Sequence, residues 1–391
     1  MIKRGLSKGQ LGSKLRKFLV VFQFAASITL IAGSVVVYKQ MNHLKNLDLG
    51  FDSEDLLTIK GPMIFDEERY PIHLSSFKSE LQKIGGIQSV TASSNIPGDE
   101  IIWLNSIKRR GQSDKQLKNI AYVGVDDDYF PTLGIDVISG RNFNRTFTSD
   151  TGTVAINQAA VRLLGFGDTE AAIGETVILY GDPKTIIGVV EDYKQMSAKA
   201  AVPPIVFPYS PDMTRYLLVK VAAGDHTDLM TSIKVSYDHF FAGNPFDFFL
   251  FETFFDKLYE SDDKFQSIFT LFTGLAIVIA CFGLFGLSSY NALQRTKEIG
   301  IRKALGASVE NILYLLTKDY LLLIAIANIL SWPLIYFTMN SWLDNYAIRI
   351  PVQFSIIPAA GVIALLIALL TIGLKSVQTA KANPADALKC E

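Results

Sequence analysis

The sequence predicts an α-helical membrane protein with four transmembrane helices and one large α+β domain outside the cytoplasm. Three observations lead to this prediction. The chain is 49% apolar and has a mean hydropathy of +0.26. It contains four long runs without a charged residue, and a long acidic stretch of mixed pattern separates the first run from the second. Such a composition is typical of a membrane protein with one exported domain.

The four uncharged runs mark the expected transmembrane helices. They contain 21, 30, 24 and 25 residues and cover Phe18–Tyr38, Phe265–Gln294, Tyr320–Leu343 and Ile350–Leu374. A helix needs about 20 apolar residues to cross the hydrocarbon core, so every run is long enough. Buried core helices are the alternative, but soluble cores rarely supply four such runs. The first run could also be a signal peptide, although no A-x-A-like cleavage site follows it, so we expect an uncleaved helix.

Basic residues beside the runs predict the orientation of the chain. The leader, residues 1–17, has six basic residues and no acid, and basic residues also gather between the second and third runs and after the fourth. Under the positive-inside rule all three segments are cytoplasmic, and both termini with them. Residues 39–264 are then outside, and they hold 22 Lys and Arg against 32 Asp and Glu.

The segment outside the membrane shows a mixed α/β pattern. Residues 55–61 and 87–97 read as strands around a helix at 70–86, and we expect these two strands to pair side by side. Residues 217–252 repeat the strand–helix–strand order. The stretch 101–208 is richer in short strands and turns. The pattern therefore predicts two β-α-β halves with a strand-rich inserted subdomain.

Two stretches should connect this domain to the membrane helices. Residues 39–47 can continue the first helix, and residues 252–265 lead into the second run with apolar side chains at helical spacing. Continuous helices here would be stiff levers across the membrane interface. The alternative is that these apolar stripes only pack in a core, and both can hold.

No catalytic, metal or cofactor motif was found. Cys281 lies in an apolar run and Cys390 near the C-terminus, so we expect no structural disulfide, and the four histidines are scattered. The consecutive acids Asp126, Asp127 and Asp128 point alternately to opposite faces of an extended segment, which favours a solvated turn over a metal site. The sequence has no P-loop, H-E-x-x-H or G-x-S-x-G pattern. A membrane-anchored ectoenzyme is an alternative function, and the missing motifs argue against it. We therefore expect no enzyme activity or cofactor in this chain, and the net charge of −1 indicates no nucleic-acid partner.

The stretch "RTKEIGIRKALGAS", residues 295–308, has the features of a short basic amphipathic helix on the cytoplasmic side. Glu298 precedes Arg302 by four residues, the favourable order for an ion pair. Gly300 costs about 1 kcal/mol in a helix relative to alanine, which suits a close approach by another backbone. Gly306 is a suitable stop, and Ser308 a suitable cap for the next helix. A helix that only sets topology at the membrane surface is the alternative.

This stretch resembles the cytoplasmic motif of MacB-like/FtsX-like ABC transporter permeases. "FLVVFQFAASITLI" is similar to the first span of that family, "YVGVDDDYFPTLGIDVISGRNF" to its periplasmic core domain and "NPADALK" to its C-terminus. The resemblance implies four transmembrane helices with a porter-like α/β domain between the first two. In the layout that it implies, a cytoplasmic leader at 1–17 precedes a transmembrane helix at 18–38, and a periplasmic core domain follows at 39–264, with its insertion at about 101–208. The permease domain covers 265–391. It contains transmembrane helices at about 266–290, 316–340 and 353–374 and a coupling helix at 295–306.

The resemblance also implies a mechanism and partners. Two permease chains, as a homodimer or heterodimer in the bacterial inner membrane, would each engage a separate ABC ATPase that holds ATP and Mg. ATP binding would move the coupling helices, and the stalk helices would relay this movement to the periplasmic domains. The residues implied to couple to the ATPase are Arg295, Lys297, Glu298, Ile299, Gly300, Ile301, Arg302, Lys303, Leu305 and Gly306.

The implied activity is the export or extraction of a peptide, a lipophilic compound or a lipoprotein, with a periplasmic adaptor as a further partner. The alternative is a regulator that transmits ATPase strokes to a periplasmic hydrolase or sensor kinase and transports nothing. Longer permeases of this type carry two modules, and this chain resembles the second one alone, as a half-size permease or a truncated gene product would.

Overall fold

The computed structural model describes residues 8–381, except for residues 102, 197–198, 214, 225–226, 295–297, 300, 303–304 and 306. The chain forms two compact units. The helical unit consists of Met1–Lys45 and Asp262–Glu391, and the α+β unit of Asn46–Ser261.

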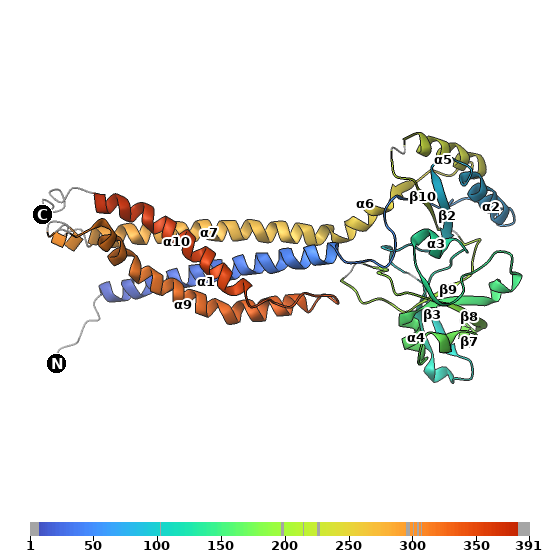
Figure 1. The fold of residues 1–391 in the computed structure, drawn as a ribbon, viewed down its shortest axis with the longest axis horizontal. Helices are drawn as coiled ribbons and strands as arrows, with labels where there is room; N and C mark the ends of the chain where they lie inside the picture. The colour runs from blue at the N-terminus through green and yellow to red at the C-terminus, as the bar shows by residue number, and fades with distance from the viewer. Residues whose placement is uncertain are drawn as a thin grey trace. The chain divides into compact units, whose positions relative to one another are not determined.

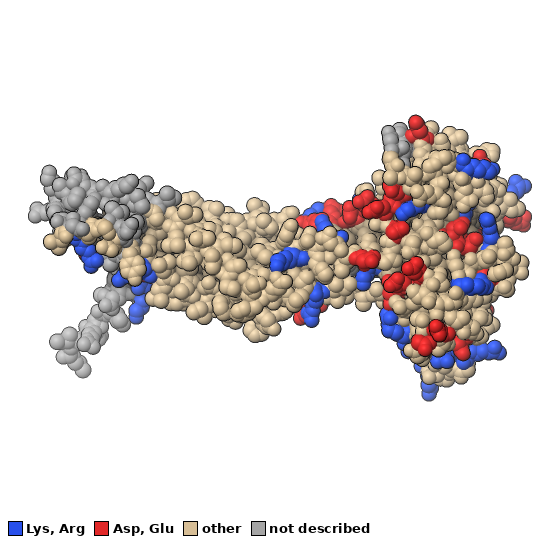
Figure 2. All heavy atoms as spheres, viewed as in Figure 1, with Lys and Arg blue, Asp and Glu red and all other residues tan. Residues whose placement is uncertain are grey.

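The helical unit contains the four predicted transmembrane helices. Among the described residues, four helices are long and apolar enough to cross a membrane. They belong to α1 (Lys8–Lys45), α7 (Glu260–Gln294), α9 (Val309–Leu343) and α10 (Ile356–Lys381). Helix α1 packs against both α9 and α10 (Figure 1). The visible face of these helices is a long stretch almost free of charged side chains (Figure 2), as contact with hydrocarbon requires.

Small and polar side chains hold these helices together. The hydroxyls of Ser34 on α1 and Thr273 on α7 lie 2.8 Å apart. Ser331 on α9 donates a hydrogen bond to the Ala25 carbonyl of α1 at 3.2 Å. A Cβ atom added at Gly361 of α10 would overlap the Asn328 amide of α9, so only glycine allows this approach. Packing of this kind is what stabilises helix pairs in a membrane, because lipid removes the hydrophobic driving force between them.

The loop between α9 and α10 is attached to α1 by one buried amide. Gln40 is fully buried, donates to the Ile348 carbonyl at 2.8 Å and accepts from the Ile350 amide at 2.9 Å. A buried amide must satisfy its donor and acceptor, so this pair of bonds determines where the loop crosses α1. Helix α1 itself continues to Lys45, seven residues past the uncharged run that ends at Tyr38, which agrees with the predicted extension.

The first and last strands of the α+β unit belong to the same four-stranded sheet, whose order is β11-β1-β10-β2. All neighbours among these described strands are antiparallel. Its strands are β1 (Leu56–Lys60), β2 (Ile87–Ser93), β10 (Tyr216–Val221) and β11 (Phe248–Leu250). Helices α2 (Tyr70–Leu81) and α5 (Thr227–Phe240) pack on each other and share one core with the sheet. Helices α3 (Tyr129–Leu133) and α6 (Phe251–Asp256) contact other positions of the same strands.

The predicted side-by-side pairing of the strands around α2 is wrong. Strand β10 lies between β1 and β2, with Val219 opposite both Leu57 and Val90. Each β-α-β half therefore leaves a gap one strand wide, and a strand of the other half fills it. This is the split β-α-β arrangement. Local patterns show where strands occur, but the identity of a neighbouring strand depends on residues more than 100 positions away.

The inserted subdomain is a second sheet whose pairings close on themselves. Its order is β5-β8-β6-β9-β4-β3-β7, and β7 also pairs with β8. The strands are β3 (Leu104–Arg109), β4 (Lys118–Tyr122), β5 (Val137–Gly140), β6 (Thr153–Asn157), β7 (Thr176–Leu179), β8 (Asp182–Val190) and β9 (Ile205–Pro208). Inward side chains of the strands form a core with α4 (Gln158–Leu164). Four short 3₁₀ turns among the described residues complete the fold: Asp114–Gln116, Thr148–Gly152, Glu170–Ala172 and Lys257–Tyr259.

The prediction of a solvated turn at the three consecutive acids is wrong for Asp126. This residue is 1% exposed and accepts hydrogen bonds from the Ala92 amide at 2.7 Å and from Lys78 Nζ at 2.6 Å. Lys78 also bonds Asp128 at 3.1 Å. Burial raises the pKa of Asp126. Burial lowers the pKa of Lys78, but the Asp126 and Asp128 carboxylates together outweigh it and raise that pKa above its usual value. The cluster attaches α2 to the segment that follows β4, and the described residues contain no group of three or more possible metal ligands.

Candidate functional site

The predicted coupling segment, residues 295–308, connects α7 to α9. Of its described residues, Glu298, Ile299, Ile301 and Arg302 are helical, and the chain turns at Leu305. The Ala307 amide donates to the Arg302 carbonyl at 2.9 Å, a six-residue closure typical of a helix end. Five of the residues implied to contact an ATPase lie outside the described residues: Arg295, Lys297, Gly300, Lys303 and Gly306.

The described side chains of the segment divide into one exposed stripe and one buried anchor. Glu298, Ile301, Arg302 and Leu305 follow the i, i+3, i+4, i+7 spacing of one helix face, and we call them the exposed stripe. Ile301 is 53% and Leu305 83% exposed, whereas Ile299 is 5% exposed. The predicted ion pair is confirmed, with Arg302 Nη2 2.8 Å from Glu298 Oε1. The stripe thus offers two apolar side chains beside a charged pair, and Ile299 packs inward.

Helix α9 starts immediately after the segment. The Ser308 side chain accepts a hydrogen bond from the Asn311 amide at 3.3 Å, which confirms the predicted cap. The coupling segment therefore leads directly into α9, with no flexible linker between Ser308 and the first turn of the helix.

Polar contacts link three helices at the end of α7 that leads into the segment. Asn291 of α7 donates to the Tyr320 hydroxyl of α9 at 2.6 Å. The Arg16 guanidinium of α1 lies 4.4 Å from the centre of the Tyr290 ring, an attractive cation–π distance. Gln294 donates to the Tyr290 hydroxyl at 2.8 Å. We call these residues the junction network. Sequence reasoning missed it, although aromatic residues near the ends of membrane spans were the available signal.

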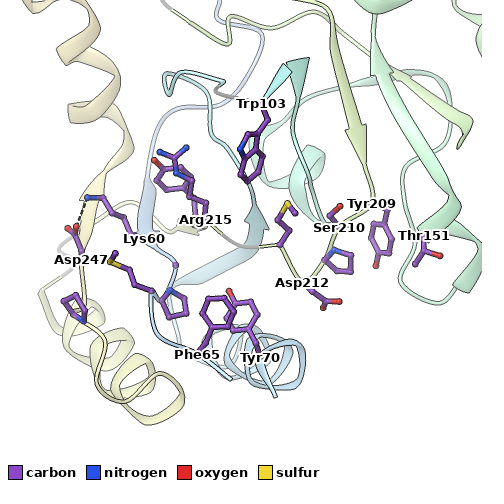
Figure 3. Close-up of a pocket in the computed structure, with 17 residues that line it drawn as sticks. Lys60, Phe65, Tyr70, Trp103, Thr151, Tyr209, Ser210, Asp212, Arg215 and Asp247 are labelled. Atoms are coloured by element: carbon purple, nitrogen blue, oxygen red, sulfur yellow. Dashed lines mark hydrogen bonds and ion pairs between the residues drawn. The ribbon is translucent and has the colours of Figure 1, made fainter. Parts of the chain in front are cut away.

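The α+β unit contains a second candidate site, a cleft of about 1050 Å³. One wall comes from the ends of β1 and β10 and the loop after β1, and the other from Trp103 and residues 209–213 (Figure 3). The cleft therefore lies where the four-stranded sheet meets the inserted subdomain. No local sequence pattern predicted the cleft, because the residues of its walls are far apart in the chain.

Four membrane helices, an α+β unit between the first two and a short connection between the second and third define a class of membrane protein, the transporter permeases with one large domain outside the membrane. Two family comparisons identify the family. Residues 270–384 match FtsX-like permease C-terminal, and residues 25–233 match MacB-like periplasmic core domain. The second match covers more than half of the chain, which therefore belongs to the MacB/FtsX family of ABC transporter permeases. Such a protein is an inner-membrane protein.

Curated relatives agree with this assignment. An uncharacterized ABC transporter permease, YvrN of Bacillus subtilis (strain 168), is 24% identical over 410 residues, which are 97% of this chain and 96% of that one. The macrolide export ATP-binding/permease protein MacB of Escherichia coli (strain K12) is 25% identical over 294 residues, 68% of this chain and 43% of that one. The chain thus matches less than half the length of the MacB proteins.

Solved structures of low similarity were also found. The periplasmic region of MacB from Actinobacillus actinomycetemcomitans is 18% identical with a TM-score of 0.39, covering 54% of this chain and 95% of that one. The extracellular domain of the noncanonic ABC-type transporter YknZ from Gram-positive bacteria is 19% identical with a TM-score of 0.34, covering 49% of this chain and 97% of that one.

Proposed function

We propose that this permease couples ATP hydrolysis by a separate ATPase chain to a conformational change in its α+β unit. The observation that carries the proposal is the exposed stripe, which places Ile301 and Leu305 beside the Glu298–Arg302 pair on one helix face. Apolar side chains left exposed next to charges are typical of a protein contact surface. The positive-inside rule puts this face in the cytoplasm, where an ATPase would be.

The route of the movement follows from the connections at the stripe. A push on Ile301 or Leu305 reaches α9 through the capped turn at Ser308 and reaches α7 directly along the chain. The junction network joins both helices, and Arg16 brings in α1. Helices α1 and α7 are those that continue toward the α+β unit, so they would carry the movement out of the membrane.

The proposed assembly contains two permease chains, each with one ATPase, which supplies ATP and Mg. Export or extraction of a peptide, lipophilic compound or lipoprotein is favoured over pure signal transmission, because the α+β unit contains a cleft large enough for a substrate. A regulator of a periplasmic hydrolase or sensor kinase would need no such cleft. A periplasmic adaptor would complete an exporter.

The test is affinity purification of the full chain from native membranes in mild detergent, with mass spectrometry of the co-purified proteins. Arg302→Glu and Leu305→Ala are expected to lose the ATPase while membrane insertion stays intact. Lys318→Glu is the matched control, since this exposed lysine on α9 lies outside the stripe. Unchanged recovery of the ATPase with both stripe variants would remove the assignment, and a second permease among the partners would establish a heterodimer.

A further inference from the structure

The cleft of the α+β unit has walls whose shape is held by the protein itself. Asn244 is buried, and its amide accepts hydrogen bonds from Met63 N and Ile64 N at 2.8 Å and donates to the Ile64 carbonyl at 2.7 Å. This clamp determines the path of the loop after β1. On the opposite wall, the Ser210 amide donates to the Val125 carbonyl at 2.8 Å, and the Met213 amide to the Ser210 carbonyl at 3.1 Å. A cleft with two such walls is largely preformed, which lowers the entropic cost of binding.

Several large apolar side chains line this cleft. Met63 is 84% exposed, and Trp103, Phe65 and Met213 are each between two-fifths and one-half exposed. Figure 3 shows Phe65 and Tyr70 side by side, with their ring centres 4.4 Å apart, across the cleft from Trp103. Methionine and aromatic side chains adapt to many apolar shapes, so this lining suits the hydrophobic body of a ligand.

The charges at the cleft favour a cation. Of the described residues that line it, the two basic ones are already paired: Lys60 with Asp247 at 2.7 Å, and Arg215 with Asp99 at 3.2 Å. The charge of each base is therefore already balanced by one acid. Asp212 is exposed and has no ion pair or hydrogen bond to any described residue, so its negative charge is uncompensated within the cleft.

The neighbourhood of Asp212 is negative as well. Burial, and then the charges of Asp127, Asp126, Asp150 and Asp212, raise the pKa of Tyr209 to about 12. A smaller cavity of about 230 Å³ shares Tyr209 and Asp212 with the cleft, and the basic residues that line it are Lys78 and Arg145. Lys78 is already bonded to Asp126 and Asp128. Asp150 is paired with Arg141. Even with Arg141 and Arg145 counted, the acids around Tyr209 outnumber the bases, so this end of the cleft attracts positive charge.

We propose that the cleft is a binding site for a drug-sized lipophilic cation, whose apolar body contacts Trp103, Phe65 and Met213 and whose positive group lies beside Asp212. The volume of about 1050 Å³ is at the upper end of ligand pockets and has room for such a molecule. The proposal deepens the proposed function, because it names the substrate class that the permease would handle.

The experiment uses two probes of nearly the same size and opposite charge, tetraphenylphosphonium and tetraphenylborate. The full chain in lipid nanodiscs carries Trp332→Phe and Trp342→Phe, so that Trp103 is the only remaining tryptophan of the three. Trp103 emission is titrated with each probe. We expect tetraphenylphosphonium to change the emission saturably and tetraphenylborate to bind at least several-fold more weakly. Met213→Ala should weaken the binding of the cation through lost apolar contact.

Asp212→Asn tests the charge. It should weaken tetraphenylphosphonium binding roughly three- to ten-fold, the effect of removing one nearby charge, and leave tetraphenylborate unchanged or bound more tightly. Asp136→Asn is the matched control, because Asp136 is exposed and lines none of the cavities described above; it should change nothing. Equal affinity for both probes, or no effect of Asp212→Asn, would overturn the cationic assignment. No response of Trp103 to either probe would overturn the site.

Binding is measured without an ATPase, so the two proposals can fail separately. Saturable cation binding by a chain that captures no ATPase would preserve the site and remove the proposed coupling. Capture of an ATPase by a chain whose Trp103 emission responds to neither probe would preserve the proposed coupling and remove the site.

Discussion

The Arg302 guanidinium lies 2.8 Å from the Glu298 carboxylate, one helical turn earlier in the coupling segment, and both side chains are about half exposed. An exposed pair of this kind contributes only about 0.3–0.5 kcal/mol to its own helix. Its position beside Ile301 and Leu305 on the exposed stripe is therefore more informative than its energy. Both charges remain accessible to a partner.

The first prediction concerns this pair. Exchanging its members, as Glu298→Arg with Arg302→Glu, keeps an ion pair within the helix but reverses the charge pattern of the stripe. We expect the exchanged chain to insert normally and to lose ATPase co-purification as strongly as Arg302→Glu alone. Recovery of the ATPase in the exchanged chain would mean that the pair only supports its own helix.

The second prediction separates docking from transmission. Tyr320→Phe removes the hydroxyl that accepts the Asn291 hydrogen bond between α7 and α9 at 2.6 Å. Bonds of this kind in membranes contribute about 0.6 kcal/mol, so the fold should survive. The ATPase should still co-purify, but its hydrolysis rate should respond less to the permease. The rate is measured in proteoliposomes, and Tyr336→Phe, on an exposed part of α9, is the control. An unchanged response would exclude this bond from the relay.

The third prediction concerns the buried acid between α2 and the segment after β4. Lys78→Met leaves the Asp126 carboxylate buried without its cation, which should cost about 3–5 kcal/mol of unfolding free energy. Adding Asp126→Asn should recover much of this loss, because it removes the buried charge and its single amide oxygen can still accept from the Ala92 amide. Chemical unfolding followed by Trp103 emission, in the chain without the other tryptophans, measures both changes. Equal destabilisation in the single and double variants would show that the pair is not coupled.

The fourth prediction is a pH dependence. Arg141 bonds both oxygens of the buried Asp150 carboxylate at 2.9 and 2.7 Å and lowers the pKa of Asp150. Because the folded pKa lies below the unfolded value of about 3.9, the stabilisation is present above that pH and lost as the pH falls through the folded pKa. Asp150→Asn should lower the unfolding free energy by about 2 kcal/mol at pH 7. The gap to the unsubstituted chain should narrow below about pH 4. A gap that is constant from pH 7 to pH 3 would contradict this cause.

The fifth prediction tests the clamp on the cleft wall. Asn244→Ala removes the bonds to Met63 and Ile64 and should loosen the loop after β1. Faster hydrogen exchange of the Met63 and Ile64 amides should accompany a several-fold loss of tetraphenylphosphonium affinity. Unchanged exchange would show that other contacts hold the loop.

Much of the helical unit was predictable from the sequence. Four uncharged runs predicted four membrane helices, because about 20 consecutive, mainly apolar residues are long enough to cross the hydrocarbon core as a helix. The Glu298–Arg302 pair and the Ser308 cap were also predictable, since both depend on residues within four positions of each other. The strand and helix positions of the two β-α-β halves followed in the same way from local periodicity.

Only the tertiary structure decided the rest. The placement of β10 between β1 and β2, the closure of the inserted sheet by β7 and β8, and the burial of Asp126 beside Lys78 all join residues that no local pattern connects. The cleft depends on such pairings as well, because Phe65, Trp103 and Met213 come from three distant parts of the chain. Consecutive residues determine which segments enter the membrane and which form strands. The free energy of packing between distant segments determines which strands become neighbours and which charges are buried.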